Sequence, residues 1–146
     1  MSELADLYQE LIIDHSRSPR NFGKLASANR EAHGHNPLCG DTVTVYLELA
    51  DGMVRDVAFE GRGCAISLAA ASLLTDMLKG KSEDQARALF ARFHAMMTGE
   101  GTPAPELDKL AALAGVRAYP MRVKCATLAG HTMLAALDRL SETSTE

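Results

Sequence analysis

The sequence predicts one domain that combines an antiparallel pair of strands with several helices, and three observations lead to this expectation. Residues 42–49 alternate between polar and apolar side chains, as a half-buried strand does, and Asp51-Gly52 is a strong signal for a hairpin turn into a second strand at 53–59. Beyond residue 64, apolar residues recur at helical spacing or occur all round a helix. The chain has 146 residues, 47% of them hydrophobic, which suffices for one core.

Caps, helix breakers and apolar periodicity predict five helices. They run from a cap at Ser2 to just before Pro19, and over residues 65–79, 82–97, 106–114 and 121–140. The clearest N-terminal signal is a capping box, in which Ser82 and Gln85 exchange hydrogen bonds with each other's backbone. Residues 16–23, with two arginines, a proline and a glycine, predict an exposed loop, and residues 98–105 predict another loop.

Charge and composition exclude several classes of protein. A net charge of −4 and a pI near 5.7 argue against a general nucleic-acid binder, because phosphate contacts need a basic surface. The N-terminus has no basic segment followed by an apolar run, and no stretch reaches the roughly 18 uninterrupted apolar residues of a membrane span. We therefore expect a cytoplasmic protein with no membrane or nucleic-acid partner. Three cysteines in a reducing compartment favour metal binding or reactive thiols over disulfides.

The segment Cys39-Gly40-Asp41 places a thiol and a carboxylate two positions apart. If the segment is extended, residues i and i+2 point to the same face, so the sulfur of Cys39 and the carboxylate of Asp41 converge. Gly40 lets the backbone bend closely around that point. A soft thiolate beside a hard carboxylate suits a borderline metal such as zinc. The alternative is a buried thiol followed by an aspartate that starts a strand.

The other two cysteines lie near the starts of two predicted helices. Cys64 follows Gly61-Arg62-Gly63 at the N-terminus of the helix at 65–79, where the helix dipole stabilises a thiolate, although a buried cysteine in a glycine turn is the alternative. Cys125 lies in the early turns of the last helix. Three thiolates and one carboxylate around a divalent cation would sum to about −2, which nearby cations could offset. The candidates are Arg62, Arg122 and Lys124.

Four segments together resemble a known family over nearly the whole chain. They are Pro19–Gly23, Asn36–Asp41, Gly61–Ser67 and Arg122–Leu128. On these motifs the chain resembles the SufU branch of the IscU/NifU N-terminal family of iron-sulfur cluster assembly proteins. The resemblance implies an α+β fold, a small antiparallel sheet packed by helices in a single domain. We expect that domain to span residues 1–140, followed by a disordered polar tail at 141–146.

The resemblance also implies the site and its partners. Carried over position by position, it implies zinc ligation by Cys39, Asp41, Cys64 and Cys125, with Cys39 the cysteine that accepts sulfur. The implied donor is a SufS-type, pyridoxal-phosphate cysteine desulfurase, one of whose histidines would replace Cys39 on zinc. Downstream iron-sulfur assembly proteins would receive the sulfur. The arginines of the loop at 16–23 could help to dock the desulfurase, although a solvated loop is an equal alternative.

Two departures from the IscU pattern bear on the function. IscU-type scaffolds have a histidine where this chain has Lys124, and a Leu-Pro-Pro-Val-Lys chaperone motif where it has residues 119–123. The extra segment around 98–113 also resembles SufU-like proteins. These features favour sulfur transfer over assembly of a transient iron-sulfur cluster on the same cysteines. A zinc-stabilised interaction module without chemistry is a third possibility.

The histidines complete the set of candidate ligands. His33 and His35 lie close before Cys39 and could be alternative ligands, although loop histidines are more often solvated. His15, His94 and His131 occupy predicted helices, and we expect them to be surface or packing residues.

Overall fold

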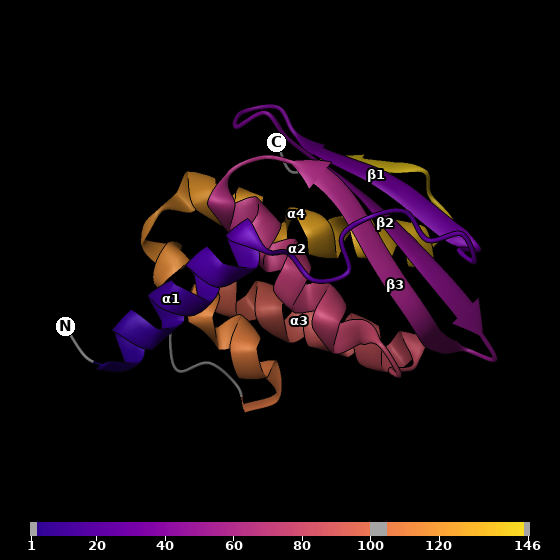
Figure 1. Cartoon of the computed structure of the whole chain (residues 1–146), viewed down its shortest axis with the longest axis horizontal. Helices are drawn as coiled ribbons and strands as arrows, with labels where there is room; N and C mark the ends of the chain where they lie inside the picture. The colour runs from indigo at the N-terminus through magenta and orange to yellow at the C-terminus, as the bar shows by residue number, and fades with distance from the viewer. Residues whose placement is uncertain (1–2, 100–104, 145–146) are drawn as a thin grey trace.

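The computed structural model describes residues 3–99 and 105–144, and it builds one four-stranded sheet with helices packed against it (Figure 1). Figure 1 shows the sheet on one side of the molecule and α1 at the opposite end. The elements in chain order are α1 (Glu3–Arg17), β1 (Arg30–Asn36), β2 (Asp41–Ala50), β3 (Met53–Arg62), α2 (Ala65–Leu78), α3 (Glu83–Thr98), the 3₁₀ segment η1 (Pro105–Ala118), α4 (Pro120–Leu137) and β4 (Glu142–Ser144).

The sheet has the strand order β3-β2-β1-β4 and is mixed. β2 pairs antiparallel with both β1 and β3, whereas β4 runs parallel to β1. The predicted hairpin is confirmed, because Asp51 and Gly52 have φ angles of 55° and 73°, as the two central residues of a type I′ turn require. The α+β class is also confirmed. The expected antiparallel sheet is formed by β1, β2 and β3, and β4 adds a parallel strand at its edge.

Strand β1 was not expected from the sequence. Its inward-facing residues are Ala32, Gly34 and Asn36, and its outward-facing residues are polar, so no apolar alternation marks it as a strand. The small inward residues have a reason, since a Cβ at Gly34 would overlap the hydroxyl of Thr132 on α4. α4 therefore lies close to β1. This close packing holds β1 in the sheet, although its sequence has no alternating apolar residues.

Strand β4 lies in the segment expected to be a disordered tail. Residues 142–144 pair with 33–35 of β1, and the N–H of His33 donates to the carbonyl of Ser141 at 2.8 Å. This pairing uses backbone groups and covers the outer edge of β1, so a polar sequence does not prevent it. Residues 145 and 146 of the expected tail lie outside the described part of the chain.

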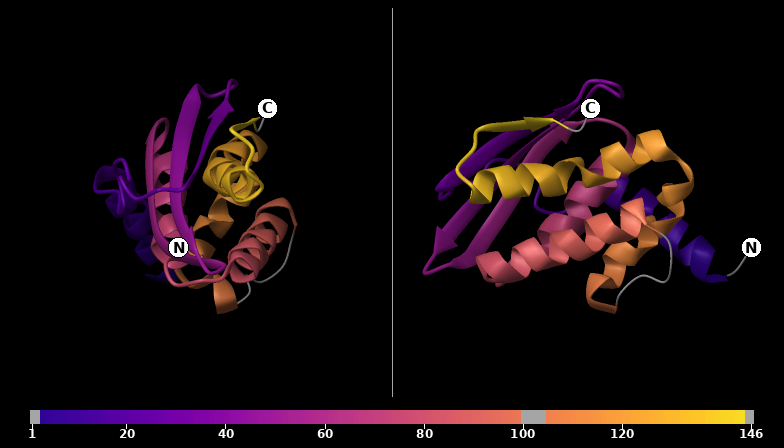
Figure 2. Two further views of the ribbon diagram at one scale, coloured as in Figure 1. Left: turned by 90° about the vertical axis from the view of Figure 1, so that its right-hand side faces the viewer. Right: turned by 180° about the vertical axis from the view of Figure 1, so that it is seen from behind.

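Helix α2 is the central helix, as its apolar sequence predicts. It contacts α1, α4, η1 and β3, and nine of its residues are buried. α4 packs on β1 and β2, and Figure 2 shows α3 and α4 side by side on the same side of the sheet. The capping box of α3 is confirmed, with Gln85 N–H donating to Ser82 Oγ at 3.1 Å and Ser82 N–H donating to Gln85 Oε1 at 2.9 Å.

Two predicted helices differ from the structure at their ends. The short helix expected at 106–114 is the longer 3₁₀ segment η1, and Asp108 within it has a positive φ of 47°. α4 ends at Leu137 rather than near residue 140, because Arg139 takes up a left-handed φ of 61° that turns the chain toward β4. Of the loop expected at 98–105, residues 100–104 lie outside the described residues.

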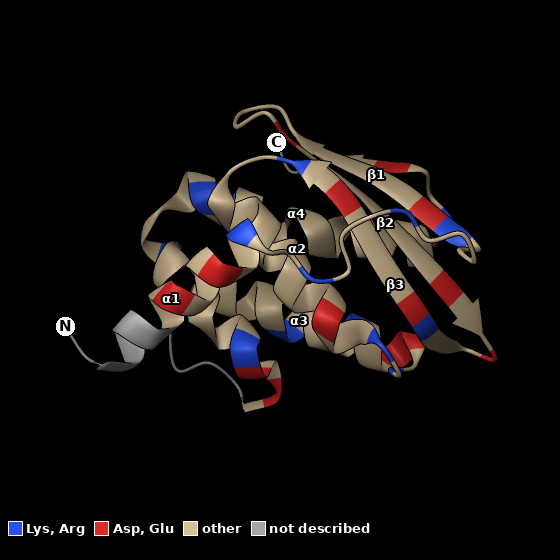
Figure 3. Ribbon diagram, viewed as in Figure 1, with Lys and Arg blue, Asp and Glu red and all other residues tan. Residues whose placement is uncertain are grey.

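Charged residues of both signs are interspersed over helices and strands (Figure 3). This distribution matches the small net charge of −4. None of the helices in the described residues is long and apolar enough to cross a membrane.

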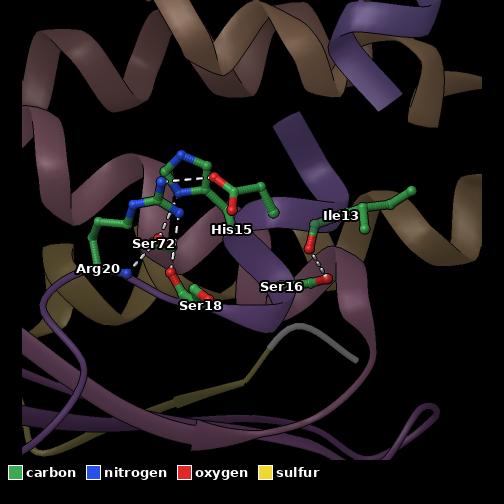
Figure 4. A network of polar contacts seen from close by, with 7 residues as sticks. Ile13, His15, Ser16, Ser18, Arg20 and Ser72 are labelled. Atoms are coloured by element: carbon green, nitrogen blue, oxygen red, sulfur yellow. Dashed lines mark hydrogen bonds and ion pairs between the residues drawn. The ribbon is translucent and has the colours of Figure 1, made fainter. Parts of the chain in front are cut away.

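The segment after α1 is partly exposed but is fixed to the fold at several points. The backbone N–H of Arg20 donates to Ser72 Oγ on α2 at 2.8 Å (Figure 4). The guanidinium of Arg20 pairs with Asp14 at 2.7 Å. Asn21 and Gly23 exchange backbone hydrogen bonds with Phe59 on β3, at 2.9 and 2.8 Å. The expected exposed loop is thus anchored to both α2 and β3.

Buried His15 completes this anchor. Its side chain lies on α1 with 2% exposure, and Nδ1 is 2.6 Å from Ser72 Oγ (Figure 4). Ser72 already accepts the N–H of Arg20, so its hydroxyl can donate to Nδ1 of a neutral ring. Burial lowers the pKa of His15 below the ordinary 6.5, and the positive charge of Arg20 lowers it further. His15 is therefore a packing residue that stays neutral.

The depressed pKa of His15 predicts a loss of stability in acid. Below pH 6.5 this histidine is protonated in the unfolded chain but stays neutral in the folded chain down to a lower pH. The free energy of unfolding therefore decreases as the pH is lowered. We expect it to fall by up to roughly 1 kcal/mol more between pH 7.5 and 5.5 in the wild type than in His15→Gln. Chemical denaturation at both pH values measures this, with exposed His35→Gln as the control. Equal losses in the wild type and His15→Gln would contradict the prediction.

Candidate metal centre

The loop between β1 and β2 carries Cys39 at its tip. Asn36 and Asp41 are paired across the two strands, so residues 37–40 form the connection. The carbonyl of Asn36 accepts the N–H groups of Cys39 and Gly40 at 3.3 and 2.9 Å, and Gly40 has a left-handed φ of 72°. The segment is therefore a tight turn, so the convergence of Cys39 and Asp41 does not depend on an extended backbone.

The turn still brings the expected side chains together. Cys39 Sγ, a carboxylate oxygen of Asp41 and Cys125 Sγ all lie within 4.8 Å of one another. Asp41 and Cys125 are 0% exposed, whereas Cys39 is half-buried. Ligands on one tetrahedral zinc, with Zn–S distances of about 2.3 Å, lie roughly 3.5–4 Å apart. Small side-chain movements would close this set around an ion.

Cys64 adjoins these three donors through Asp41. It is the N-cap residue of α2, as expected, and its backbone N–H donates to Asp41 Oδ1 at 3.0 Å. Its thiol lies 3.8 Å from Asp41 Oδ2. Three of the four expected ligands, Cys39, Asp41 and Cys125, thus form one close cluster, whereas Cys64 lies outside that cluster and contacts its Asp41 carboxylate. Their role as ligands stays a prediction.

Two further residues shape the site. A Cβ at Gly63 would overlap the carboxylate of Asp41, so only glycine leaves room for this approach.

Asn36 is fully buried, and its side-chain amide donates to Cys125 Sγ at 3.8 Å while its Oδ1 accepts the N–H of Leu38 at 3.2 Å. It ties the Cys39 turn to α4. This role of Asn36 was not predicted, and its place directly before Pro37 in the Cys39 motif was the available sequence signal.

The electrostatics of the cluster favour a bound cation. Burial raises the pKa of the Cys125 thiol well above its ordinary value, and hydrogen bonds with Asp41 and Cys39 raise it further. The thiols and the carboxylate therefore cannot all be anionic unless positive charge enters the site. A soft donor set with one carboxylate suits zinc, so the residues fit the metal that the sequence implies.

Arg122 supplies positive charge at the edge of the site. It lies in the first turn of α4, three residues before Cys125. The pKa of Arg122 is raised, first by a hydrogen bond to Cys125 and then by the charge of Cys64. Arg122 therefore lies beside the thiols whose charge it was expected to offset, and that role stays a prediction.

The two histidines before the turn point elsewhere. His33 and His35 are exposed on the outer face of β1, and His33 Nδ1 lies 2.7 Å from Thr44 Oγ1 while its Nε2 lies 3.2 Å from the carboxylate of Glu31. Within the part of the chain that the structure describes, neither belongs to the three-donor cluster. Their proposed role as alternative ligands gains no support.

Comparisons with known proteins show the family to which the chain is similar. Residues 7–126 match the family of the NifU-like N terminal domain. The iron-sulfur cluster assembly scaffold protein IscU of Streptococcus pyogenes serotype M1 is 38% identical over 140 residues, which cover 95% of this chain and 87% of that protein. The zinc-dependent sulfurtransferase SufU of Bacillus subtilis is 40% identical over 128 residues, which cover 87% of this chain and 86% of that protein.

A solved structure extends the similarity to three dimensions. A protein of Fervidobacterium islandicum, described as an iron-sulfur cluster assembly scaffold for the SUF system, matches with a TM-score of 0.84 and 34% identity. The match covers 94% of this chain and 99% of that one. Relatives called scaffold and sulfurtransferase are similar to this chain to almost the same degree. Overall sequence similarity therefore does not distinguish between the scaffold and the sulfurtransferase activity.

The contact between Gly63 and Asp41 generates a test of the centre. In Gly63→Ala the new methyl group must displace the Asp41 carboxylate, so we expect zinc affinity to fall by roughly tenfold or more. Competition with a chelator of known affinity measures this. Gly115→Ala is the matched control, because a Cβ there meets nothing within 4 Å. Unchanged zinc affinity in Gly63→Ala would show that this carboxylate does not bind the metal.

Proposed function

The chain belongs to the family of NifU-like N-terminal domains, whose members include the IscU and SufU iron-sulfur cluster assembly proteins, and we propose that it is a zinc-dependent sulfur acceptor. In this proposal a cysteine desulfurase delivers persulfide sulfur to Cys39. The protein then passes the sulfur on for iron-sulfur cluster assembly. The observation that carries the proposal is a half-buried thiol, on a turn, among buried metal-type donors.

The proposed ligands are Cys39, Asp41, Cys64 and Cys125. The three cysteines lie near the Asp41 carboxylate. When bound, zinc would hold these thiols as thiolates and fix their positions without redox chemistry. The protein shields two of the four donors from water, since Asp41 and Cys125 have no exposed surface. Arg122 offsets part of the negative charge at its edge.

Cys39 is the thiol that can leave the ligand set at least cost. Cys125 is fully buried within α4, and Cys64 is held at the start of α2 by its N–H bond to Asp41. Cys39 instead lies in a four-residue connection held by backbone bonds to Asn36. Moving this turn disturbs no helix and little of the core. Three donors then remain around the metal position.

The proposed transfer is a thiol–disulfide type exchange. The Cys39 thiolate attacks the terminal sulfur of the persulfide on the desulfurase cysteine, and a new S–S bond forms. The S–S bond of the donor breaks, and its cysteine leaves as a thiolate. Cys39 then carries the persulfide, and no external oxidant or reductant is needed.

The second candidate is a scaffold on which an iron-sulfur cluster is assembled, because relatives bear that name and clusters are held by the same kinds of thiolate. Lys124 weighs against it. It immediately precedes Cys125 on α4, where the scaffold-type sequences carry a histidine, and a protonated ammonium group cannot bind a metal. This difference favours the acceptor.

The two candidates predict different isolated proteins. For an acceptor we expect colourless protein with about one zinc per chain, which elemental analysis and an absorption spectrum measure. Removal of zinc should also lower the melting temperature, because the ligands come from four separate elements. Brown protein that contains iron and sulfide in place of zinc would support the scaffold instead.

The assignment of Cys39 predicts a difference between single-cysteine variants. Cys39→Ser should keep the fold and much of its zinc, because Asp41 and the other two cysteines remain, yet it should carry no persulfide and fail to stimulate a desulfurase. Cys125→Ser, the matched control, should lose zinc and with it activity. Mass spectrometry after incubation with desulfurase and cysteine locates the persulfide. A persulfide on Cys64 or Cys125, with Cys39 unmodified, would overturn the assignment.

A further inference from the structure

A second group of metal-binding side chains lies away from the cysteines, between α3 and α4. His94 on α3 and His131 on α4 have ring centroids 5.4 Å apart, with ring planes at 80°. The ring of Phe90 packs edge-on against both, at 5.0 Å from His131 and 5.8 Å from His94. The two helices run side by side here (Figure 2). The function proposed above makes no use of this pair.

The position of the pair is fixed by close helix packing. A Cβ at Gly130 would overlap the ring of Phe90, so glycine at this point lets α4 approach α3 closely. Phe90 is buried, and His94 lies one helical turn further along α3, on the same face. His131 directly follows Gly130 on α4. Both histidines therefore lie beside a close contact between the two helices.

The separation of the rings matches two imidazoles on one ion. At a metal–nitrogen distance of about 2.0–2.1 Å and a near-tetrahedral angle, two bound imidazoles have ring centroids roughly 5 Å apart. The observed 5.4 Å needs only rotation of the rings about their side-chain bonds. Edge-to-face packing of aromatic rings gives the same range of distances, so the distinguishing observation is that the two rings also share a surface hollow.

Solvent and an ion can reach the pair. Both histidines line a surface hollow of about 450 Å³, together with Arg87, Phe90, Ala91 and Leu134. The guanidinium of Arg87 pairs with Asp138 at 2.7 Å, which offsets its repulsion of a metal ion. Burial lowers the pKa of His131, and the charge of His94 lowers it further, so this ring is neutral and can bind a metal at neutral pH.

We infer that His94 and His131 form an accessory site for a divalent ion that prefers imidazole, such as Zn²⁺. Imidazole ligands suit zinc, copper and nickel, whereas Mg²⁺ and Ca²⁺ prefer oxygen ligands. Two protein ligands leave further coordination positions to water or to a partner's side chain. Such an ion binds more weakly than one held by four ligands, and its exchange does not depend on the cysteine cluster.

The test uses untagged, zinc-loaded protein titrated with further Zn²⁺ by calorimetry. We expect a second ion to bind, with affinity at least about tenfold weaker in His94→Gln and in His131→Gln. His35→Gln is the matched control, an exposed histidine on β1 that should leave the second ion unaffected. Imidazole nitrogen resonances of His94 and His131 should shift together during the titration.

Three results would overturn the inference. These are no binding of a second ion, equal affinity in the wild type and both histidine variants, or a loss of binding in His35→Gln alone. Because each variant keeps the cysteines and Asp41, its first zinc and its persulfide formation report separately on the function proposed above. Retention of the first zinc also shows that the variants are folded.

Discussion

The buried carboxylate of Asp41 is the constraint on which the site depends. A carboxylate without exposed surface is costly unless hydrogen bonds or a cation compensate it. Here Oδ1 accepts the N–H of Cys64 at the start of α2, and thiols from the β1–β2 turn, α2 and α4 surround the rest. Residue 63 must be glycine here, because a side chain would occupy the space of the Asp41 carboxylate. The need to compensate the buried Asp41 carboxylate thus constrains where the β1–β2 turn, α2 and α4 can lie.

The same geometry explains why scaffold and sulfur-acceptor names occur among similar proteins. Both activities need thiolates held around a metal position by rigid elements, and Cys64 and Cys125 at the starts of two buried helices meet that need. They differ in how easily one ligand exchanges. In the function proposed here, the short turn that carries Cys39 and the lysine in place of a possible imidazole ligand beside Cys125 would both favour exchange of one ligand over a closed set.

Helix α4 connects the proposed cysteine site with the inferred histidine site through contacts that only small residues allow. Gly34 lets it lie close to β1, which brings Cys125 to the turn that carries Cys39. Gly130 lets it lie close to Phe90 of α3, which brings His131 to His94. Because protein interiors are close-packed, a methyl group at either glycine would move the helix or its neighbour. Two glycines thus set the distances on which both sites rest.

The sequence by itself determined the features whose signals are local. The alternation along β2, the turn at Asp51-Gly52, the apolar α2 and the capping box of α3 each depend on residues a few positions apart, and the motifs around the cysteines identified the family. Tertiary structure alone decided the rest. β1 and β4 lack an apolar pattern and form through backbone pairing and close packing against α4, while the pairing of His94 with His131 joins residues far apart in the chain. Such contacts are set by how close two elements can approach, which no local pattern records.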